Sequence, residues 1–307
     1  MRKSNLMRPL KGIVPPMITP LLDRDTLDVE GLEKLIEHIL GGGVHGLFIL
    51  GTTGEAPSLS YDLRYELIKR TSKQVNGRVP LLVGVTDTSF SESIKLARFS
   101  AEQGADAAVL APPYYFSQGQ PELIEYIGHV TKELPLPLFL YNMPGCTKVH
   151  MDPETVMILS EYPRIIGLKD SSCDMMYFHK IRAMLKQNPE FAVLLGPEEL
   201  LAESVLLGAD GGVNGGANMF PSLYVALYNA AVKKDIDTVV ELHKKVVQIS
   251  MTIYSTGRYG SSVLKGIKCA LGLMGVCNDF ISEPFHRFRD PEREIIRKFL
   301  SEIKIDV

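Results

Sequence analysis

The chain has 307 residues and a mass of 34.0 kDa, and it is 45% hydrophobic and 22% charged, which is the composition of an ordinary globular protein. A net charge of −3 argues against the strongly basic surface typical of nucleic-acid-binding domains. No apolar run is long enough to span a bilayer, and the basic residues after Met1 are not followed by the apolar segment of a signal peptide. We therefore expect a cytoplasmic protein that binds neither nucleic acid nor membrane.

Eight strand-like apolar runs alternate with segments of helical periodicity over residues 1–234. They recur at intervals of roughly 30 residues, which is the spacing of βα units. The runs begin near Ile13, Gly46, Val79, Ala108, Pro137, Ile165, Phe191 and Asp210.

Helix-start and helix-stop residues flank the segments between these runs. We predict helices around residues 32–39, 63–68, 94–99, 123–127 and 181–185. The predicted N-caps are Ser60, Ser89, Asp152 and Asp174, first turns contain Pro121, Pro153 and Pro221, and exits lie at 41–43 and Gly104.

Strict βα alternation implies a parallel sheet with right-handed crossovers, and eight units favour closure into a (β/α)8 TIM barrel over an open doubly wound sheet. A solenoid is disfavoured because the units share no residue signature beyond their period. Helical patterns continue through residues 239–253, 263–273 and 292–303 without an intervening linker. We predict a barrel over residues 1–234 and additional C-terminal helices over 235–307 that pack on it.

The sixth run presents one lysine, Lys169, at its end. Side chains alternate faces along a strand, so Ile165, Gly167 and Lys169 should point into the barrel while Ile166 and Leu168 point outward. An interior lysine without a partner is commonly held as the neutral amine, which is a nucleophile for Schiff-base chemistry on a carbonyl substrate. The alternative is a strand-end lysine that reaches solvent or pairs with a remote carboxylate.

Hydroxyl groups follow two other strands at the end of the barrel where chemistry is expected. The second strand runs into Gly51-Thr52-Thr53-Gly54-Glu55, where backbone N–H groups and threonine hydroxyls could converge on a small carboxylate, unless the motif is only a tight turn. The fifth strand ends at Tyr141, one βα unit before Lys169, so its phenol should lie beside the amine and shuttle protons. The alternative is a tyrosine that merely satisfies a backbone carbonyl.

Further candidate residues follow the fourth, seventh and eighth strands, and for the first two groups a purely structural interpretation is also open. Tyr114 and Tyr115 are adjacent tyrosines, which usually indicate core or interface packing. Glu198 and Glu199 could accept hydrogen bonds from substrate hydroxyls, although acidic residues are also favoured in a first helical turn. The glycines of the eighth run, including Gly215, could admit a substrate close to the backbone.

The four cysteines show no CxxC spacing, and the seven histidines form no HxxxH or HxH pair. The cysteines are too sparse for a disulfide scaffold and are expected to be reduced thiols. The sequence gives no metal signature, and we expect no metal and no other cofactor.

Four ordered motifs give the chain its resemblance to the dihydrodipicolinate synthase/N-acetylneuraminate lyase family. They are Gly51-Thr52-Thr53-Gly54-Glu55, Tyr114-Tyr115, Tyr141-Asn142-Met143-Pro144 and Gly167-Leu168-Lys169-Asp170. The resemblance covers nearly the whole length. It implies a (β/α)8 barrel and a class I lyase that binds pyruvate or another 2-oxo acid as a lysine Schiff base, together with an aldehyde partner or product.

The resemblance also implies residue roles. Lys169 would form the imine, Tyr141 and Thr52 would relay protons, and Tyr115 would complete the relay from a neighbouring subunit of a dimer or tetramer. Thr53, with neighbouring N–H groups including that of Gly51, would hold the carboxylate. Gly196 and Val213 would line the pocket.

One position departs from the family's synthase pattern. True dihydrodipicolinate synthases carry an arginine two residues after the proline of the Tyr-Asn-x-Pro motif, where this chain has Cys146. A thiol cannot replace a guanidinium as a carboxylate clamp, and Lys148 would substitute only if its loop redirected it. We therefore expect a different 2-oxo acid, such as a 2-keto-3-deoxy sugar acid or sialic acid, for aldol cleavage, condensation or dehydration.

Three alternatives stay open at this point: dihydrodipicolinate synthase proper, 4-hydroxy-2-oxoglutarate aldolase, and a barrel that binds a 2-oxo acid without catalysis. Glu198 and Glu199 fall where sialic-acid lyases place acidic residues that read the sugar tail, which favours a polyhydroxylated substrate. The complete set of Lys169, Tyr141, Thr52, Thr53 and Tyr115 argues against a non-catalytic protein.

Overall fold

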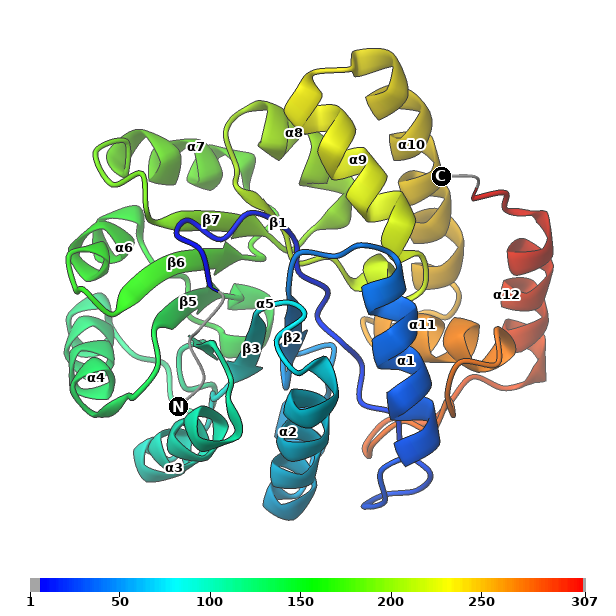
Figure 1. Cartoon of the computed structure of the whole chain (residues 1–307), viewed down its shortest axis with the longest axis horizontal. Coiled ribbons are helices and arrows are strands. Elements are labelled where there is room, and N and C mark those ends of the chain that lie inside the picture. The colour runs from blue at the N-terminus through cyan, green and yellow to red at the C-terminus, as the bar shows by residue number, and fades with distance from the viewer. Residues whose placement is uncertain (1–5, 306–307) are drawn as a thin grey trace.

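The apolar runs form one parallel sheet in the computed structural model, which describes residues 6–305. Within that range the sheet has eight strands in the order β1-β8-β7-β6-β5-β4-β3-β2, and helices surround it (Figure 1). The strands are β1 (Gly12–Ile13), β2 (Leu47–Ile49), β3 (Leu81–Gly84), β4 (Ala107–Leu110), β5 (Leu138–Asn142), β6 (Ile165–Asp170), β7 (Ala192–Leu195) and β8 (Gly211–Gly212).

The segment that follows β1 closes the barrel against β2. Pro16 and Phe48 form a parallel bridge, the Met17 N–H donates to the Phe48 carbonyl at 2.8 Å, and the Phe48 N–H donates to the Pro15 carbonyl at 3.0 Å. The predicted (β/α)8 TIM barrel is confirmed.

Helices follow the strands along the chain, and several begin as predicted. The Ser60 hydroxyl accepts from the Leu63 N–H, and the Asp174 carboxylate accepts from the Met176 and Tyr177 N–H groups, whereas Ser89 and Asp152 occupy N-cap positions without a side-chain hydrogen bond. The α-helices are α1 (Val29–Gly41), α2 (Tyr61–Val75), α3 (Phe90–Gln103), α4 (Gln120–Glu133), α5 (Pro144–Thr147), α6 (Pro153–Ser160), α7 (Met175–Met184), α8 (Leu201–Leu206), α9 (Pro221–Lys233), α10 (Ile236–Ile249), α11 (Ser262–Leu273) and α12 (Asp290–Glu302). Short helical turns are η1 (Ala56–Ser58), η2 (Glu198–Leu200), η3 (Gly215–Asn218) and η4 (Ser250–Tyr254).

The buried side chains separate into two clusters. The smaller one fills the barrel interior and includes Phe48, Phe139 and Tyr141. The larger one lies between the strands and the surrounding helices. Because the two faces of each strand pack into different clusters, the barrel is a packed core and its chemistry is confined to the strand ends.

A β-bulge changes the predicted faces of the sixth strand. Leu138 pairs with Ile165 but Phe139 pairs with Gly167, so Ile166 is an extra residue in the ladder. Ile166 lies in the interior cluster and Ile165 in the outer one, opposite to our prediction. Beyond the bulge the predicted alternation holds, and Leu168 packs outward.

Three helices continue beyond the barrel. The predicted boundary at 234/235 falls between α9 and α10, although it remains a prediction as a domain boundary. Helices α10, α11 and α12 lie along one side of the barrel, next to α1 and α9 (Figure 1). Within residues 6–305, no helix is long and apolar enough to cross a membrane.

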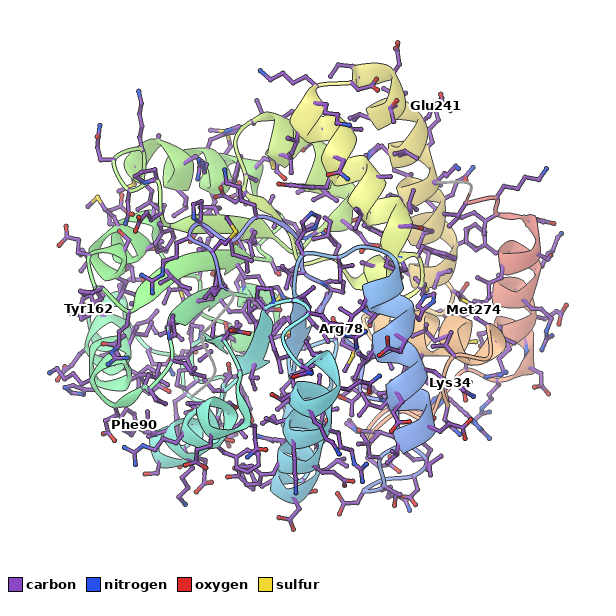
Figure 2. The ribbon with its side chains drawn as sticks, viewed as in Figure 1. Lys34, Arg78, Phe90, Tyr162, Glu241 and Met274 are labelled. Carbon is purple, nitrogen blue, oxygen red and sulfur yellow. The ribbon has the colours of Figure 1, made fainter. Side chains whose placement is uncertain are left out.

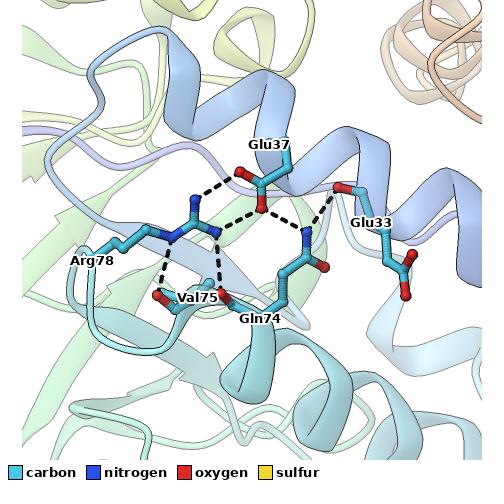
Figure 3. Close-up of polar contacts among 5 residues, drawn as sticks. All are labelled: Glu33, Glu37, Gln74, Val75 and Arg78. Atoms are coloured by element: carbon cyan, nitrogen blue, oxygen red, sulfur yellow. Dashed lines mark hydrogen bonds and ion pairs between the residues drawn. The ribbon is translucent and has the colours of Figure 1, made fainter.

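Charged side chains such as Lys34 and Glu241 project outward from the helices (Figure 2). Figure 3 shows polar contacts that join α1 to the end of α2. The Arg78 guanidinium donates to both Glu37 carboxylate oxygens at 2.7 Å, and the Gln74 amide donates to Glu37 at 2.8 Å and to the Glu33 carbonyl at 2.9 Å. These bonds connect neighbouring helices on the outside of the barrel, away from the carboxyl ends of the strands.

Candidate active site

Tyr141 and Lys169 are direct neighbours at the ends of β5 and β6, as predicted. The Lys169 Nζ lies 4.0 Å from the centroid of the Tyr141 ring and 5.0 Å from that of Phe48. The lysine is only 5% exposed, and within residues 6–305 its Nζ forms no ion pair with a carboxylate. An amine held over two rings and away from carboxylates is well placed to act as a nucleophile.

The next pair along the same strands fixes this arrangement. Asn142 and Asp170 pair in register, and the Asn142 amide donates to the Asp170 carboxylate at 2.8 Å with both residues buried. Asp170 also accepts from the Ser172 N–H and hydroxyl, and Asn142 accepts from the Met151 N–H. Burial raises the pKa of Asp170, and these donors oppose the shift. The hydrogen bonds hold the strand ends that carry the lysine and the tyrosine.

Thr52 meets Tyr141 above the barrel, with 3.2 Å between the two hydroxyl oxygens. The turn that carries Thr52 begins at Leu50, which has a positive φ of 57°. It passes so close to β3 that a Cβ on Gly84 would overlap the Leu50 carbonyl oxygen. Glycine at position 84 therefore permits the approach of the turn to the neighbouring strand.

The same turn presents unused backbone donors. Within residues 6–305 the N–H groups of Thr52, Thr53 and Gly54 have no internal acceptor, while the Glu55 and Ala56 N–H groups bond back to the Thr52 and Gly51 carbonyls. Free N–H groups that follow one another in a turn form an anion-binding concavity. This geometry suits the predicted carboxylate site at Thr53.

A pocket of about 170 Å³ opens beside Tyr141 at the strand ends. None of its lining residues is charged. Cys146, the position of the sequence departure, lies in the wall and is exposed to solvent as a residue; partial desolvation raises the pKa of its thiol, an effect that the nearby Lys169 opposes. The lining residues are Phe48, Leu50, Gly51, Thr52, Ala56, Pro57, Gly84, Thr86, Val109, Ala111, Tyr114, Tyr141, Met143, Cys146 and Thr147.

The adjacent tyrosines after β4 separate. Tyr114 lines the pocket, whereas Tyr115 is 77% exposed and stacks edge-on against the equally exposed Phe116. Tyr115 is absent from the pocket lining, and its predicted role in the relay from a neighbouring subunit stays a prediction.

Glu198 and Glu199 lie apart from the pocket. Glu198 is 4% exposed, and its carboxylate accepts from the Tyr224 hydroxyl and the Gly216 N–H, both at 2.8 Å. Burial raises the pKa of Glu198 to about 7. Glu199 is half-buried and accepts from the Ser250 hydroxyl.

The remaining predicted residues take different positions. Val213 packs in the barrel interior with Tyr141. A Cβ on Gly196 would overlap the Ser171 hydroxyl at the end of β6, so this glycine permits close packing there. Gly215 faces Ile267 of α11 and lies outside the pocket lining.

Sequence reasoning missed Phe48 and Thr86. Phe48 alternates with Leu47 and Ile49, which pack outward, so the period of β2 could have identified it as an interior residue beneath the lysine. Thr86 follows β3 and lines the pocket, but no recognisable motif surrounds it in the sequence. Among residues 6–305 no group of three or more His, Cys, Asp or Glu side chains is arranged to hold a metal ion.

A parallel barrel that ends in an interior lysine, a cross-strand tyrosine and a hydroxyl-bearing turn defines a lyase of the class I, Schiff-base-forming aldolase type. The chain belongs to the dihydrodipicolinate synthetase family, whose model matches residues 9–303. The predicted family and enzyme class are therefore confirmed.

Three similar proteins illustrate the family. The structure of dihydrodipicolinate synthase from Bacteroides thetaiotaomicron is 58% identical, with a TM-score of 0.95, over 97% of this chain and 100% of that one. A probable 2-dehydro-3-deoxy-D-pentonate aldolase of Escherichia coli is 33% identical over 87% of this chain and 89% of its own length. YagE, an E. coli prophage protein of the family solved in complex with pyruvate, is 29% identical with a TM-score of 0.90, over 96% of this chain and 98% of that one.

Proposed function

We propose that Lys169 forms an imine with pyruvate or a related 2-oxo acid, and that the enzyme makes or breaks a bond of that bound substrate. The observation that carries the proposal is the cross-strand pairing of Lys169 with Tyr141, which puts a buried amine 4.0 Å from a phenol ring. The pyruvate complex of YagE, a related protein, supports the choice of substrate class.

The geometry suggests a role for each group. The Lys169 amine attacks the ketone carbon, and the linked hydroxyls of Tyr141 and Thr52 carry protons to and from the departing water. Thr53 and the free N–H groups of its turn hold the carboxylate. The iminium then serves as the electron sink for the bond that is made or broken, so activity should survive chelation by EDTA.

The wall around Cys146 supports a substrate whose tail carries no carboxylate. None of the residues that line the pocket is charged, so a carboxylate that entered it would lose water without gaining a cation, which is disfavoured. A 2-keto-3-deoxy sugar acid fits this wall better than aspartate semialdehyde does, and the similarity to a probable pentonate aldolase favours the same class. A role for Glu198 and Glu199 in reading tail hydroxyls stays a prediction.

Dihydrodipicolinate synthase activity is the second candidate. It is favoured by the 58% identity to the structure of dihydrodipicolinate synthase from Bacteroides thetaiotaomicron. Because residue 146 is a cysteine, this activity needs a cation from another position to hold the second substrate's carboxylate. 4-Hydroxy-2-oxoglutarate aldolase activity faces the same requirement. The non-catalytic alternative predicts that no imine forms.

We further propose that the active form is a dimer or a tetramer, and that the protein acts in the cytoplasm. The exposed rings of Tyr115 and Phe116 provide an apolar contact for a second subunit, which would bring one Tyr115 to the other subunit's relay. Analytical ultracentrifugation of the active enzyme tests this proposal, because a fully active monomer would contradict the shared relay.

The imine is tested by borohydride reduction in the presence of pyruvate, followed by mass spectrometry. One pyruvate should be added per chain at Lys169, and Lys169→Arg should abolish the adduct. Lys148→Arg, in the loop after α5, is the matched control and should retain it. An adduct that persists in Lys169→Arg would contradict the assignment.

The substrate is tested by ranking kcat/KM for sialic acid, 2-keto-3-deoxygluconate and 4-hydroxy-2-oxoglutarate beside the condensation of pyruvate with aspartate semialdehyde. We expect a sugar acid to rank first, and Cys146→Arg to favour the condensation relative to Cys146→Ser. If the wild-type enzyme is best at the condensation, another cation fills the role of the missing arginine.

A further inference from the structure

A buried ion pair joins the catalytic turn to the C-terminal helices. The Lys268 ammonium, on α11, pairs with the Glu55 carboxylate, and the two side chains are 1% and 3% exposed. Helix α11 belongs to the C-terminal helices at one side of the barrel (Figure 1), and its lysine reaches the last residue of the turn that carries Thr52 and Thr53.

Both charged groups are held by further hydrogen bonds. The second Glu55 oxygen accepts from the Ser282 N–H at 2.7 Å, and Lys268 donates to the Phe280 carbonyl at 2.6 Å. The Asn278 N–H donates to Asp28 at 2.8 Å, which anchors the same segment to the start of α1. The two donors that meet Glu55, and the carbonyl that accepts from Lys268, thus belong to a segment that is itself fixed to α1.

The backbone of Glu55 connects the ion pair to Thr52 and, through it, to Tyr141. Its φ is 59°, a left-handed conformation, and its N–H donates to the Thr52 carbonyl at 3.1 Å. The Thr52 hydroxyl in turn contacts the Tyr141 hydroxyl at 3.2 Å. A non-glycine residue in this conformation is disfavoured unless its surroundings hold it, and here the ion pair and the Ser282 N–H do so.

We infer that Glu55 and Lys268 are positioning residues for the reaction: their ion pair sets the turn whose N–H groups and Thr52 hydroxyl face the substrate. The C-terminal helices would then contribute to catalysis without contacting the substrate. The inference rests on the proposed function, because its readouts use pyruvate.

The first test compares two substitutions that each neutralise one carboxylate of an ion pair. Glu55→Gln keeps the shape and the acceptor for Ser282 but leaves Lys268 without a counter-charge. Asp210→Asn, the control, weakens the Arg182–Asp210 pair, 3.4 Å long, at the start of β8 and therefore at the opposite end of the barrel.

Both variants should melt at lower temperature than the wild type. At a temperature where both are folded, only Glu55→Gln should raise the KM for pyruvate, measured in the direction of condensation with an aldehyde, by about tenfold, because a small misplacement of binding groups is costly. An unchanged KM in Glu55→Gln would overturn the inference and leave the pair a purely structural one.

The second test uses the double variant Glu55→Gln/Lys268→Met, which leaves no uncompensated charge. It should recover most of the lost melting temperature, since a neutral pair of similar volume is tolerated where a broken pair is not. The KM for pyruvate should stay raised, because nothing then draws the turn towards α11. A double variant with the wild-type KM would contradict the proposed positioning.

A third measurement needs no substitution. Pyruvate trapped on the wild-type enzyme by borohydride should slow amide hydrogen exchange in residues 51–58 and in residues 262–282 together, while α12 is unchanged. Protection confined to residues 51–58 would overturn the coupling. If the wild-type enzyme forms no adduct at all, the proposed function has failed, which is a different outcome from an adduct without coupling.

Discussion

Two buried carboxylates follow barrel strands, Glu55 after β2 and Glu198 after β7, and they are stabilised in different ways. Glu55 is 5% exposed and faces the ammonium of Lys268. Glu198 is 4% exposed and, among residues 6–305, faces no cation, but it accepts from the Tyr224 hydroxyl and the Gly216 N–H. The first carboxylate is compensated by charge and the second only by dipoles.

The comparison shows how the partner determines the response to pH. Without a cation, burial raises the pKa of Glu198 to about 7, so this group takes up a proton in the neutral range. At the other site burial lowers the pKa of Lys268, and the Glu55 carboxylate opposes that shift. We therefore expect the Glu55 site to be sensitive to loss of its partner, and the Glu198 site to be sensitive to pH.

The largest effect is expected from Lys268→Met, which leaves the Glu55 charge buried without its cation. Breaking a buried pair in this way should lower the free energy of unfolding by about 3–5 kcal/mol. Urea denaturation at pH 7 measures it. A loss below about 1 kcal/mol, the range of exposed pairs, would show that the two sites do not differ in the way proposed.

The next effect concerns pH. Because the pKa of Glu198 is raised in the folded state, the native protein binds its proton more tightly than the unfolded chain, and stability should fall as pH rises from about 4.5 to about 7. The full span corresponds to about 3 kcal/mol. Glu198→Gln removes this titration, so the variant should gain stability relative to the wild type over that window. Parallel stability curves for the two proteins would contradict the assignment.

Tyr224→Phe sharpens the comparison at the same carboxylate. It deletes a buried hydroxyl donor, and a buried acceptor left unpaired costs about 1–3 kcal/mol. The loss should be greater at pH 8 than at pH 5, because the ionised carboxylate depends more on its donors. Tyr228→Phe on the same helix, where no hydrogen bond to Glu198 is present, provides the control.

The smallest effect is expected outside the barrel, at the Arg78–Glu37 pair of Figure 3. Hydrogen bonds from Arg78, followed by Gln74, lower the pKa of Glu37 to about 2. Its contribution is therefore present above pH 4.5 and lost as pH falls towards 2. Both side chains are about half exposed, so Arg78→Ala should cost about 0.2–1 kcal/mol at pH 7. A larger loss of stability in thermal denaturation would show that this surface pair contributes as much as the buried Glu55–Lys268 pair.

The sequence allowed the barrel and the pairing of Lys169 with Tyr141 to be predicted because both depend on local periodicity. Each predicted strand start lies within about two residues of the observed one, for example Val79 against Leu81. Lys169 and Tyr141 were placed on neighbouring strands because one βα unit separates them, and the register confirms it. The roles assigned to the site residues, including Thr52, Thr53 and Tyr115, stay predictions.

Features that depend on distant partners could not be predicted. The bulge at Ile166 inserts one residue, which strict alternation cannot anticipate. The partner of Glu55 lies on a helix near the other end of the chain, and no periodicity connects the two. Glu198 could be read as exposed or buried, because a carboxylate at a helix start suits either position until the tyrosine that meets it is known.

The closure of the barrel has a consequence for hydration. Pro15 and Pro16 have no N–H to donate, so the seam between the first and second strands is held by the two bonds of Phe48, by the His45 N–H to the Ile13 carbonyl and by the Ile13 N–H to the His45 ring. Phe48 is also the ring beneath the Lys169 amine. A transient opening at this seam would therefore admit solvent to the Lys169 amine through the wall of the barrel.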